Sequence, residues 1–226
     1  MRVCSRLVMT ALALSSGAGV AHAQTTVFAG ATLGEDQSAY LGAQRRLATE
    51  SAGGWSVRGG VSAGRYDYDA NGVGIDGSFM QVQALVLREW FKGPAYAAVG
   101  VGPRFAETRL KPDDPGNERE GGRFDGVVTA EAAWNGELWR ANAYAEYGID
   151  QSAFYTRLVA TRRLAGPWRA GVEALAEGDR TYDRLGGGLV LAHGAASSRE
   201  IRVSIGAMDR DGGSGAYAAV AWVRSF

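Results

Sequence analysis

The side chains best suited to catalysis lie near residue 193, where the single histidine of the predicted mature chain precedes two serines. His193, Ser197 and Ser198 contain the base and the nucleophile of a hydrolytic triad. A triad requires the base at hydrogen-bond distance from the nucleophile. Both serines fall in a predicted turn, Gly194 to Ser198, where a scaffold holds side chains least firmly. We therefore predict that the chain is not an enzyme.

A second candidate pair of catalytic groups is formed by Glu173 and Glu177, which share one face of a predicted strand. Glycoside hydrolysis requires two carboxyl groups about 5 to 10 Å apart. Four strand residues at ~3.3 Å each separate these two backbones by about 13 Å. Hydrolysis by this pair is disfavoured, although carboxylates from adjacent strands could still pair.

Asp67, Asp69 and Asn71, followed by a glycine, copy the first half of a calcium-binding loop, in which oxygen ligands alternate along the chain. The second half differs, because the twelfth position is Ser78 instead of a bidentate glutamate and no helices are predicted beside it. We expect an ordinary outer loop from Asp67 to Gly77. No metal and no cofactor are predicted.

The amino terminus has the order of a secretory signal peptide. Two arginines precede an apolar run from Leu7 to Leu14, and Ala21-His22-Ala23 places small residues at the cleavage spacing. We predict that residues 1–23 are a signal peptide and that residues 24–226 form one domain. The sole cysteine, Cys4, leaves with the signal peptide, so the mature chain has no thiol for disulfides or metal.

The charge of the mature chain excludes one class of partner. Without the two signal-peptide arginines, 24 − 2 = 22 basic residues stand against 24 acidic residues. This balance leaves no excess of positive charge that would attract nucleic acid. No mature segment approaches the roughly 18 uninterrupted apolar residues of a membrane-spanning helix. The chain is therefore soluble in the periplasm, secreted, or a barrel.

Twelve segments with strand character favour a barrel. Most are near the ~10 residues that a tilted membrane strand requires. Between residues 124 and 135, Trp134 shares a face with apolar side chains, whereas Glu131 shares the opposite face with polar ones. We predict an all-β, antiparallel transmembrane (outer-membrane) β-barrel of about 12 strands. The segments are 26–34, 38–49, 55–66, 78–90, 95–107, 124–135, 137–147, 153–164, 168–177, 184–192, 199–207 and 215–226.

The six tryptophans lie beside alternate predicted turns or near the carboxyl terminus. Alternate turns of a membrane barrel lie on one side, and indole rings favour the membrane interface. Because successive side chains of a strand point to opposite faces, each indole is expected on the lipid-facing side of its strand. The short turns at this end would face the periplasm and the longer connections the exterior. A soluble β-sandwich shows similar alternation and is the alternative fold. The tryptophans are Trp55, Trp90, Trp134, Trp139, Trp168 and Trp222.

The same alternation along the strands predicts which charged and aromatic side chains line the lumen. Mixed charges there are expected to pair, because an unpaired ion away from water is costly. They form either a structural ion-pair network or the lining of a polar conduit. The tyrosines either fill space or present faces on which sugar rings stack. The candidates for lumen lining and glucan contact are Tyr66, Tyr96, Arg140, Tyr144, Glu146, Tyr155, Arg157, Glu173 and Tyr217. Further inward charges are Arg58, Arg104, Glu131, Arg163, Arg169, Glu177 and Arg202.

The connection Pro112 to Asn117 is predicted to be stiff. Two prolines fix φ, and its aspartates and asparagine can hydrogen-bond to the backbone. Asp113, Asp114 and Asn117 are the candidate site residues of this outer loop. A self-capped turn is the favoured interpretation of the aspartates, with a calcium ligand pair or a contact to glucan hydroxyls as alternatives. The loop could also fold inward as a plug.

The run Leu110-Lys111-Pro112-Asp113-Asp114-Pro115-Gly116-Asn117, followed by three glycines and then by Glu131 and Trp134, resembles the most recognisable segment of the cellulose biosynthesis protein BcsS family. The stretches Gly171 to Gly186 and Asp211 to Tyr217 are similar to the later part of that family. Residues 24 to about 66 match only as generic barrel strands.

This resemblance implies a bacterial outer-membrane component of cellulose synthesis and export, without established catalytic residues. We predict a non-catalytic barrel that acts in export or surface tethering of the glucan, located in the outer membrane after Sec-type cleavage of the signal peptide. The alternative is a small general porin or a structural outer-membrane protein. Predicted partners are outer-membrane lipid, cellulose and other cellulose-secretion components, but not nucleic acid.

Overall fold

The computed structural model describes residues 25–34, 36–47, 52–70, 72–117, 119–180, 183–194, 199–210 and 213–226. The predicted signal peptide, Asn71, Ser197 and Ser198 lie outside the described residues. Within the described ranges, no helix is both long enough and apolar enough to cross a membrane.

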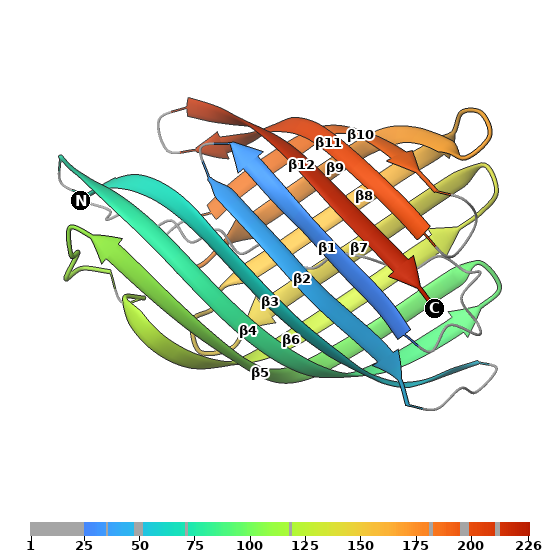
Figure 1. Ribbon diagram of the computed structural model, residues 1–226, viewed down its shortest axis with the longest axis horizontal. Helices are drawn as coiled ribbons and strands as arrows, with labels where there is room; N and C mark the ends of the chain where they lie inside the picture. Colours follow the sequence, from blue (N-terminus) through green and yellow to red (C-terminus); the bar gives the residue numbers. More distant parts are fainter. Residues whose placement is uncertain are drawn as a thin grey trace.

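The described residues form twelve antiparallel strands that close into one barrel (Figure 1). Strands adjacent in the sequence pair with one another, and β1 closes the barrel on β12 from the Thr26–Ser225 pair to the Gly34–Tyr217 pair. The predicted fold class and strand number are confirmed. Closure satisfies the backbone groups that an open sheet edge would expose. The strands are β1 (Thr25–Gly34), β2 (Gln37–Arg46), β3 (Gly53–Ala70), β4 (Val73–Lys92), β5 (Ala95–Lys111), β6 (Gly121–Asn135), β7 (Trp139–Gly148), β8 (Phe154–Arg163), β9 (Trp168–Gly178), β10 (Asp183–His193), β11 (Arg199–Arg210) and β12 (Gly213–Ser225).

The two ends of the barrel differ in how their strands are connected. One end, called the tryptophan end, carries the connections that follow each even-numbered strand. Phe226 N donates to Thr25 O at 2.9 Å there, so the first and last strands meet at this end. Gly93 and Gly166 have φ of +57° and +53° in its tight turns, a conformation that glycine adopts at little cost. The opposite end is called the loop end.

Four strands are longer than a membrane crossing requires. β3, β4, β5 and β6 contain 18, 20, 17 and 15 residues, whereas a tilted crossing needs about 9 to 11. Their two hairpins project beyond the other strands at the loop end, on the left of Figure 1. The expected loop from Asp67 to Gly77 is therefore wrong, because β3 continues to Ala70 and β4 begins at Val73. Outward polar side chains interrupt the apolar alternation in this extension.

The outward face between the ends is a band of exposed apolar side chains. Val86, Val101 and Val128 lie side by side on β4, β5 and β6 and are 46%, 58% and 44% exposed. Soluble proteins rarely expose contiguous apolar surface of this extent, whereas the lipid-facing band of a membrane barrel requires it.

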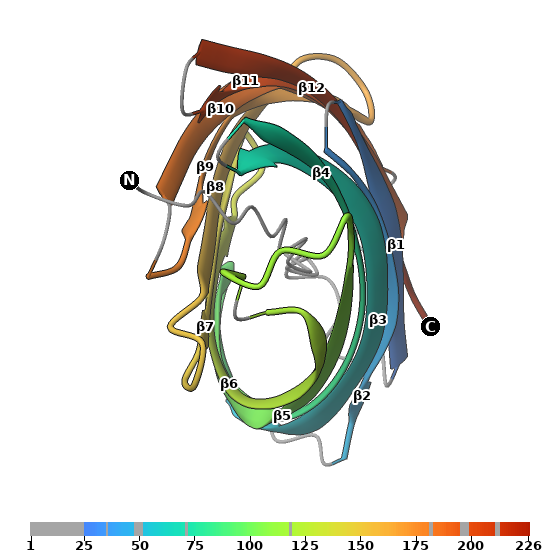
Figure 2. The ribbon, with the colours of Figure 1, turned by 90° about the vertical axis from the view of Figure 1, so that its left-hand side faces the viewer.

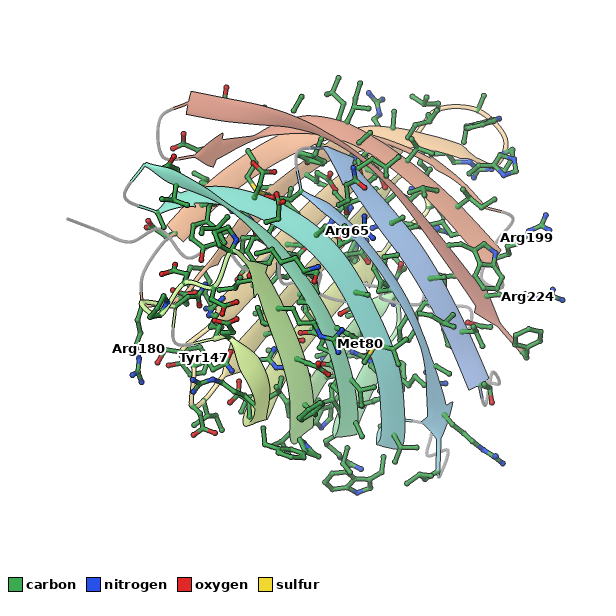
Figure 3. All side chains as sticks on the ribbon, turned by 60° about the vertical axis from the view of Figure 1, so that its left-hand side comes forward. Arg65, Met80, Tyr147, Arg180, Arg199 and Arg224 are labelled. Carbon is green, nitrogen blue, oxygen red and sulfur yellow. The ribbon has the colours of Figure 1, made fainter. Side chains whose placement is uncertain are left out.

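The predicted outward orientation of the tryptophans is confirmed. Five indoles are 43% to 52% exposed, and Trp222 is half-buried on the same outward face. The Arg88 guanidinium lies over the rings of Trp55 and Trp90, at 5.6 and 6.0 Å from their centroids. Arg199 and Arg224 project away from the wall at this end (Figure 3). The mixture of indoles and cations suits the headgroup layer of a membrane.

Inward glycines make room for aromatic rings that lie across neighbouring strands. A Cβ at Gly30 would lie 2.5 Å from the Tyr40 ring, and a Cβ at Gly64 would lie 2.5 Å from the Phe79 ring. Tyr66 lies over Gly77 in the same way. Each pair lets a ring rest flat on the inner wall, where a larger residue would displace it.

Three apolar clusters fill part of the lumen. The largest, in the loop-end half, joins β3, β4 and β5 to β7, β8 and β9 through residues such as Tyr66 and Tyr155. The second contains Leu85, Leu87 and Val127 in the tryptophan-end half. The third joins β1, β2 and β12. Figure 2 shows the elongated cross-section that brings the two long walls of the barrel near each other.

Candidate functional site

The charged side chains of the central lumen pair with one another, as expected. Arg58 on β3 forms an ion pair with Glu131 on β6, and both side chains are 3% exposed. Nε and Nη2 of Arg58 also donate to Gln44 Oε1 at 2.9 and 2.6 Å. β4 and β5 separate the two strands in the wall, so this contact crosses the lumen. Pairing and hydrogen bonding together offset the cost of burying the two ions.

A second network surrounds Arg104 on β5. Its Nη2 lies 2.6 Å from Asp125 Oδ2 and its Nη1 lies 2.9 Å from Glu146 Oε1. Tyr144 Oη donates to the other oxygen of Glu146 at 2.7 Å. The predicted lumen residues Tyr144 and Glu146 therefore belong to one buried, hydrogen-bonded unit.

A third network lies nearer the tryptophan end and centres on Glu89, whose side chain is 1% exposed. Arg46 Nε lies 3.1 Å from Glu89 Oε2. Gln44 Nε2 and Tyr96 Oη donate to Glu89 Oε1 at 2.8 and 3.2 Å. The predicted residue Tyr96 is thus inward and belongs to this network.

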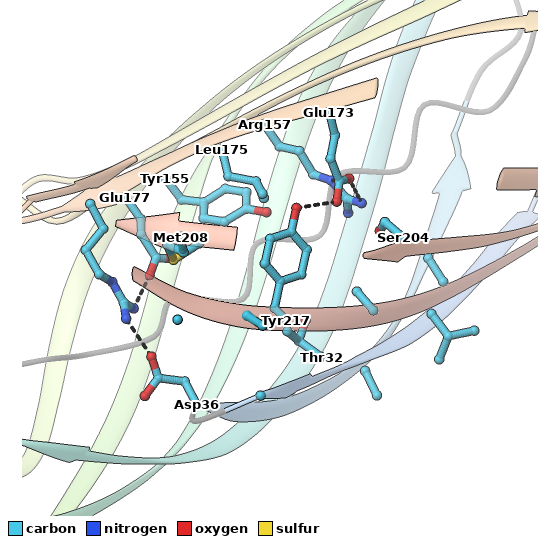
Figure 4. A pocket seen from close by; sticks show the side chains of 18 of the residues that line it. Thr32, Asp36, Tyr155, Arg157, Glu173, Leu175, Glu177, Ser204, Met208 and Tyr217 are labelled. Atoms are coloured by element: carbon cyan, nitrogen blue, oxygen red, sulfur yellow. Dashed lines mark hydrogen bonds and ion pairs between the residues drawn. The ribbon is translucent and has the colours of Figure 1, made fainter. Parts of the chain in front are cut away.

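A cavity lies between β1, β8, β9 and β12 in the loop-end half (Figure 4). Arg157 Nε and Nη2 donate to Glu173 Oε2 at 3.0 and 2.5 Å. Tyr217 Oη donates to Glu173 Oε1 at 2.7 Å, and Tyr155 lies beside this group. Four of the predicted glucan-contact residues are therefore neighbours. Their rings and charged groups form an amphipathic wall of the kind that binds sugars.

The mouth of this cavity is bounded by a further set of charges. Arg184 on β10 forms an ion pair with Glu177 on β9, and its Nη1 lies 2.5 Å from Asp36 Oδ2, between β1 and β2. β11 and β12 separate β10 from β1, so the contact to Asp36 also spans strands that are not neighbours. The cavity measures about 80 Å³. Small-molecule pockets measure roughly 300 to 1,000 Å³, so this space suits a few waters.

The loop at residues 112–120, between β5 and β6, is fastened to the inner wall of the loop end. Tyr68 Oη donates to Asp114 Oδ2 at 2.7 Å, and Asn117 Nδ2 donates to Tyr68 Oη at 3.0 Å. Asp114 and Asn117 are buried, whereas Asp113 is exposed. Asp114 Oδ1 also accepts a hydrogen bond from Gly116 N at 3.1 Å, as predicted for a self-capped turn at this aspartate.

This loop also reaches toward β9. Arg119 forms an ion pair with Asp179, which follows β9. Figure 2 shows the segment between β5 and β6 lying across the opening of the barrel. The aromatic rings of Tyr66 and Tyr68 stack beside it, with centroids 6.2 Å apart and planes at 17°. The loop therefore narrows the loop end, as expected for an inward-folded segment.

The family described as "Cellulose biosynthesis protein BcsS" matches residues 13–226. The chain belongs to the BcsS family. The match covers all of the described residues, so the barrel and its lumen networks are features of a BcsS-family chain. A search of curated proteins found no match.

Solved outer-membrane barrels share the architecture of this BcsS-family chain. The transport unit of the autotransporter AIDA-I from Escherichia coli is 8% identical, with a TM-score of 0.53 and coverage of 89% of each chain. The beta domain of the Bordetella autotransporter BrkA is 14% identical, with a TM-score of 0.53 and coverage of 90% of this chain and 100% of that chain. The translocator domain of NalP from Neisseria meningitidis is 12% identical, with a TM-score of 0.52 and coverage of 91% and 90%. These similarities show the fold alone.

The candidate catalytic groups of this BcsS-family chain are engaged in other contacts. His193 packs edge-on against Trp168 with centroids 4.6 Å apart. Glu173 and Glu177 pair with Arg157 and Arg184 respectively, as two separate ion pairs. Within the described ranges, no group of three or more His, Cys, Asp or Glu side chains is placed to hold a metal ion.

The structure adds inward residues that sequence reasoning missed. Tyr40 lies in the cavity wall, and its parity in β2 could have predicted this position. Tyr68 falls within the segment expected to be an outer loop, and a loop has no regular alternation from which an inward position could be predicted. The predicted residue Arg140 lies in a separate pocket at the tryptophan end. Arg163, predicted inward, is exposed at the last position of β8.

Proposed function

We propose that this BcsS-family barrel lies in the outer membrane with its tryptophan end toward the periplasm and its loop end toward the exterior. Short turns at one end and extended hairpins at the other support this orientation, because outer-membrane barrels have short periplasmic turns. Residues 1–23 would be removed as a signal peptide, leaving residues 24–226 as the mature domain.

The proposed role is non-catalytic tethering of cellulose at the cell surface, in preference to passage of the glucan through the lumen. The observation that carries this proposal is the crosswise pairing of buried charges, Arg58 with Glu131 and Arg184 with Asp36. A threading polymer would have to separate these pairs, and an uncompensated buried charge costs about 3 to 5 kcal/mol. The same contacts disfavour a small general porin.

The glucan contact is proposed at the loop end. Tyr66 and Tyr68 stack on each other and are each 3% exposed, so they support the loop from within and do not present ring faces to a glucan. Asp113 is exposed and free to accept hydrogen bonds from glucan hydroxyls, whereas Asp114 and Asn117 hold the loop in place. The cavity residues Tyr155, Arg157, Glu173 and Tyr217 would contact glucan only if the Arg184–Asp36 pair opened.

Deletion of the gene separates tethering from export. If the barrel tethers cellulose, the total amount of extracellular cellulose stays the same but moves from the cell pellet to the medium. If the barrel exports cellulose, total extracellular cellulose falls. Unchanged pelleting together with reduced uptake of small solutes would support the porin and overturn the proposal.

A point substitution tests the proposed contact. Asp113→Ala should reduce pelleted cellulose, because it removes an exposed acceptor without touching the bonds to Tyr68. Asp150→Ala is the matched control, since Asp150 is also an exposed carboxylate at the loop end but lies outside the loop. Equal cellulose retention in the two variants would remove Asp113 from the site.

A further inference from the structure

The second pocket, at the tryptophan end, is formed by the β6–β7 and β8–β9 connections together with Gly194, which follows β10. Asn135, Gly136 and Glu137 line it from the β6–β7 turn, Gly166 and Pro167 from the β8–β9 turn, and Gly194 from the end of β10. Its volume is about 390 Å³. This is within the roughly 300 to 1,000 Å³ of small-molecule sites.

Three guanidinium groups, those of Arg140, Arg163 and Arg169, line this pocket. Arg140 Nη1 lies 3.3 Å from Glu200 Oε2, but Glu200 also binds Arg202 Nη2 at 2.7 Å. One carboxylate is thus shared between two cations. Elsewhere in the lumen, Arg58, Arg104, Arg157 and Arg184 each have at least one carboxylate of their own.

The remaining two guanidinium groups bind neutral acceptors. Arg169 Nη2 donates to the main-chain oxygens of Gly136 and Glu137 at 3.4 and 2.7 Å, and its Nη1 donates to Leu138 O at 3.3 Å. Arg163 Nε donates to Gly166 O at 3.3 Å. Carbonyl oxygens satisfy N–H groups but carry no negative charge, so neither guanidinium group is hydrogen-bonded to a carboxylate in these contacts. The Glu137 carboxylate is exposed on its turn.

Two donors of residues that line this pocket are closed to solvent. Among the described residues, Arg140 Nε and Asn135 Nδ2 are buried and have no hydrogen-bond partner. Buried donors without an acceptor are costly and are normally satisfied. The features of the pocket that favour an anionic ligand are therefore its space and its three guanidinium groups.

We propose that this pocket binds a phosphate group. A phosphate presents several acceptor oxygens and up to two negative charges, and planar guanidinium groups bind it through paired hydrogen bonds. A single carboxylate would supply only one charge to three cations. In the proposed orientation the pocket opens to the periplasm, so the phosphate would belong to a soluble periplasmic solute or to a phospholipid headgroup of the inner leaflet.

The test uses the purified full barrel in a non-ionic detergent at low ionic strength. Inorganic phosphate is titrated by calorimetry, with sodium chloride at matched ionic strength as the reference. Arg163→Gln should weaken phosphate binding by about tenfold or more, because it removes one charged donor. Arg163 is exposed at a strand end, so this variant should fold. Arg180→Gln is the matched control, because Arg180 is an exposed arginine at the opposite end.

A second arm identifies the source of the phosphate. The barrel is titrated with dispersed phosphatidylglycerol and, separately, with a neutral glycolipid. Binding of phosphatidylglycerol but not of inorganic phosphate, with the same loss in Arg163→Gln, would assign the site to a lipid headgroup. Equal binding by the wild-type protein and Arg163→Gln, or equal effects of phosphate and chloride, would overturn the proposal. Neither outcome bears on cellulose retention, so this site is tested independently of tethering.

Discussion

Arg58 on β3 and Glu131 on β6 form an ion pair between two strands that are not neighbours in the barrel wall. Both side chains are buried, and Gln44 occupies two further donors of the guanidinium. The pair therefore connects these two strands across the lumen. Lipid contacts only the outer face of a membrane barrel, so the inner face can hold buried polar contacts of this kind.

Replacement of Glu131 by Ala should lower the free energy of unfolding by about 3 to 5 kcal/mol, because Arg58 would remain buried without its carboxylate. The double variant Arg58→Met with Glu131→Leu should recover most of this loss, since it removes both charges and keeps the volume. Urea unfolding in lipid vesicles measures both changes. A double variant no more stable than Glu131→Ala would contradict a stabilising role for this ion pair across the lumen.

Replacement of Gly77 by Ala should destabilise the barrel by about 1 to 3 kcal/mol, because the new Cβ would overlap the Tyr66 ring. Gly74→Ala on the same strand is the matched control, since no atom lies within 4 Å of a Cβ built there. The two variants are compared by thermal unfolding of the detergent-solubilised protein. Equal midpoints would mean that Tyr66 does not rest on Gly77.

Replacement of Val101 by Arg should cost roughly 2 to 4 kcal/mol, because Val101 faces outward near the middle of the lipid-facing band. Leu185→Arg should cost only about 0 to 1 kcal/mol, because Leu185 is equally apolar and exposed but lies near the loop end of β10. Refolding into vesicles measures both values. Similar small costs at the two positions would indicate water, not lipid, around the wall.

Alternation of apolar and polar side chains predicted all twelve strands, because one wall face meets lipid and the other meets the polar lumen. It failed only beyond the membrane, where the outward face is polar although the inward face still carries the buried side chains of Tyr68, Ala70 and Ile75. There Asp67 and Asp69 on the outward face produced the appearance of a loop, although β3 continues to Ala70. Strand extension above the bilayer depends on hydrogen bonding between β3 and β4, which side-chain alternation does not report.

Alternation along the strands predicted which side chains point inward, but it could not predict which side chains they pair with. Glu173 and Glu177 lie on one strand, yet they bind Arg157 of β8 and Arg184 of β10. Arg184 also meets Asp36, 148 positions away in the sequence. Such choices depend on the curvature and closure of the barrel, which place particular strands opposite one another.

Replacement of Tyr68 by Phe should release the loop at residues 112–120, because the Tyr68 hydroxyl both donates to Asp114 and accepts from Asn117. Loss of two hydrogen bonds, one of them to a carboxylate, should raise the rate of tryptic cleavage after Arg119 by about tenfold or more. Tyr66→Phe is the matched control, since the buried Tyr66 hydroxyl has no hydrogen-bond partner among the described residues. If both variants were cleaved at the wild-type rate, the ion pair between Arg119 and Asp179 alone would hold the loop. Faster cleavage in Tyr68→Phe only would instead assign the fastening of the loop to the tyrosine.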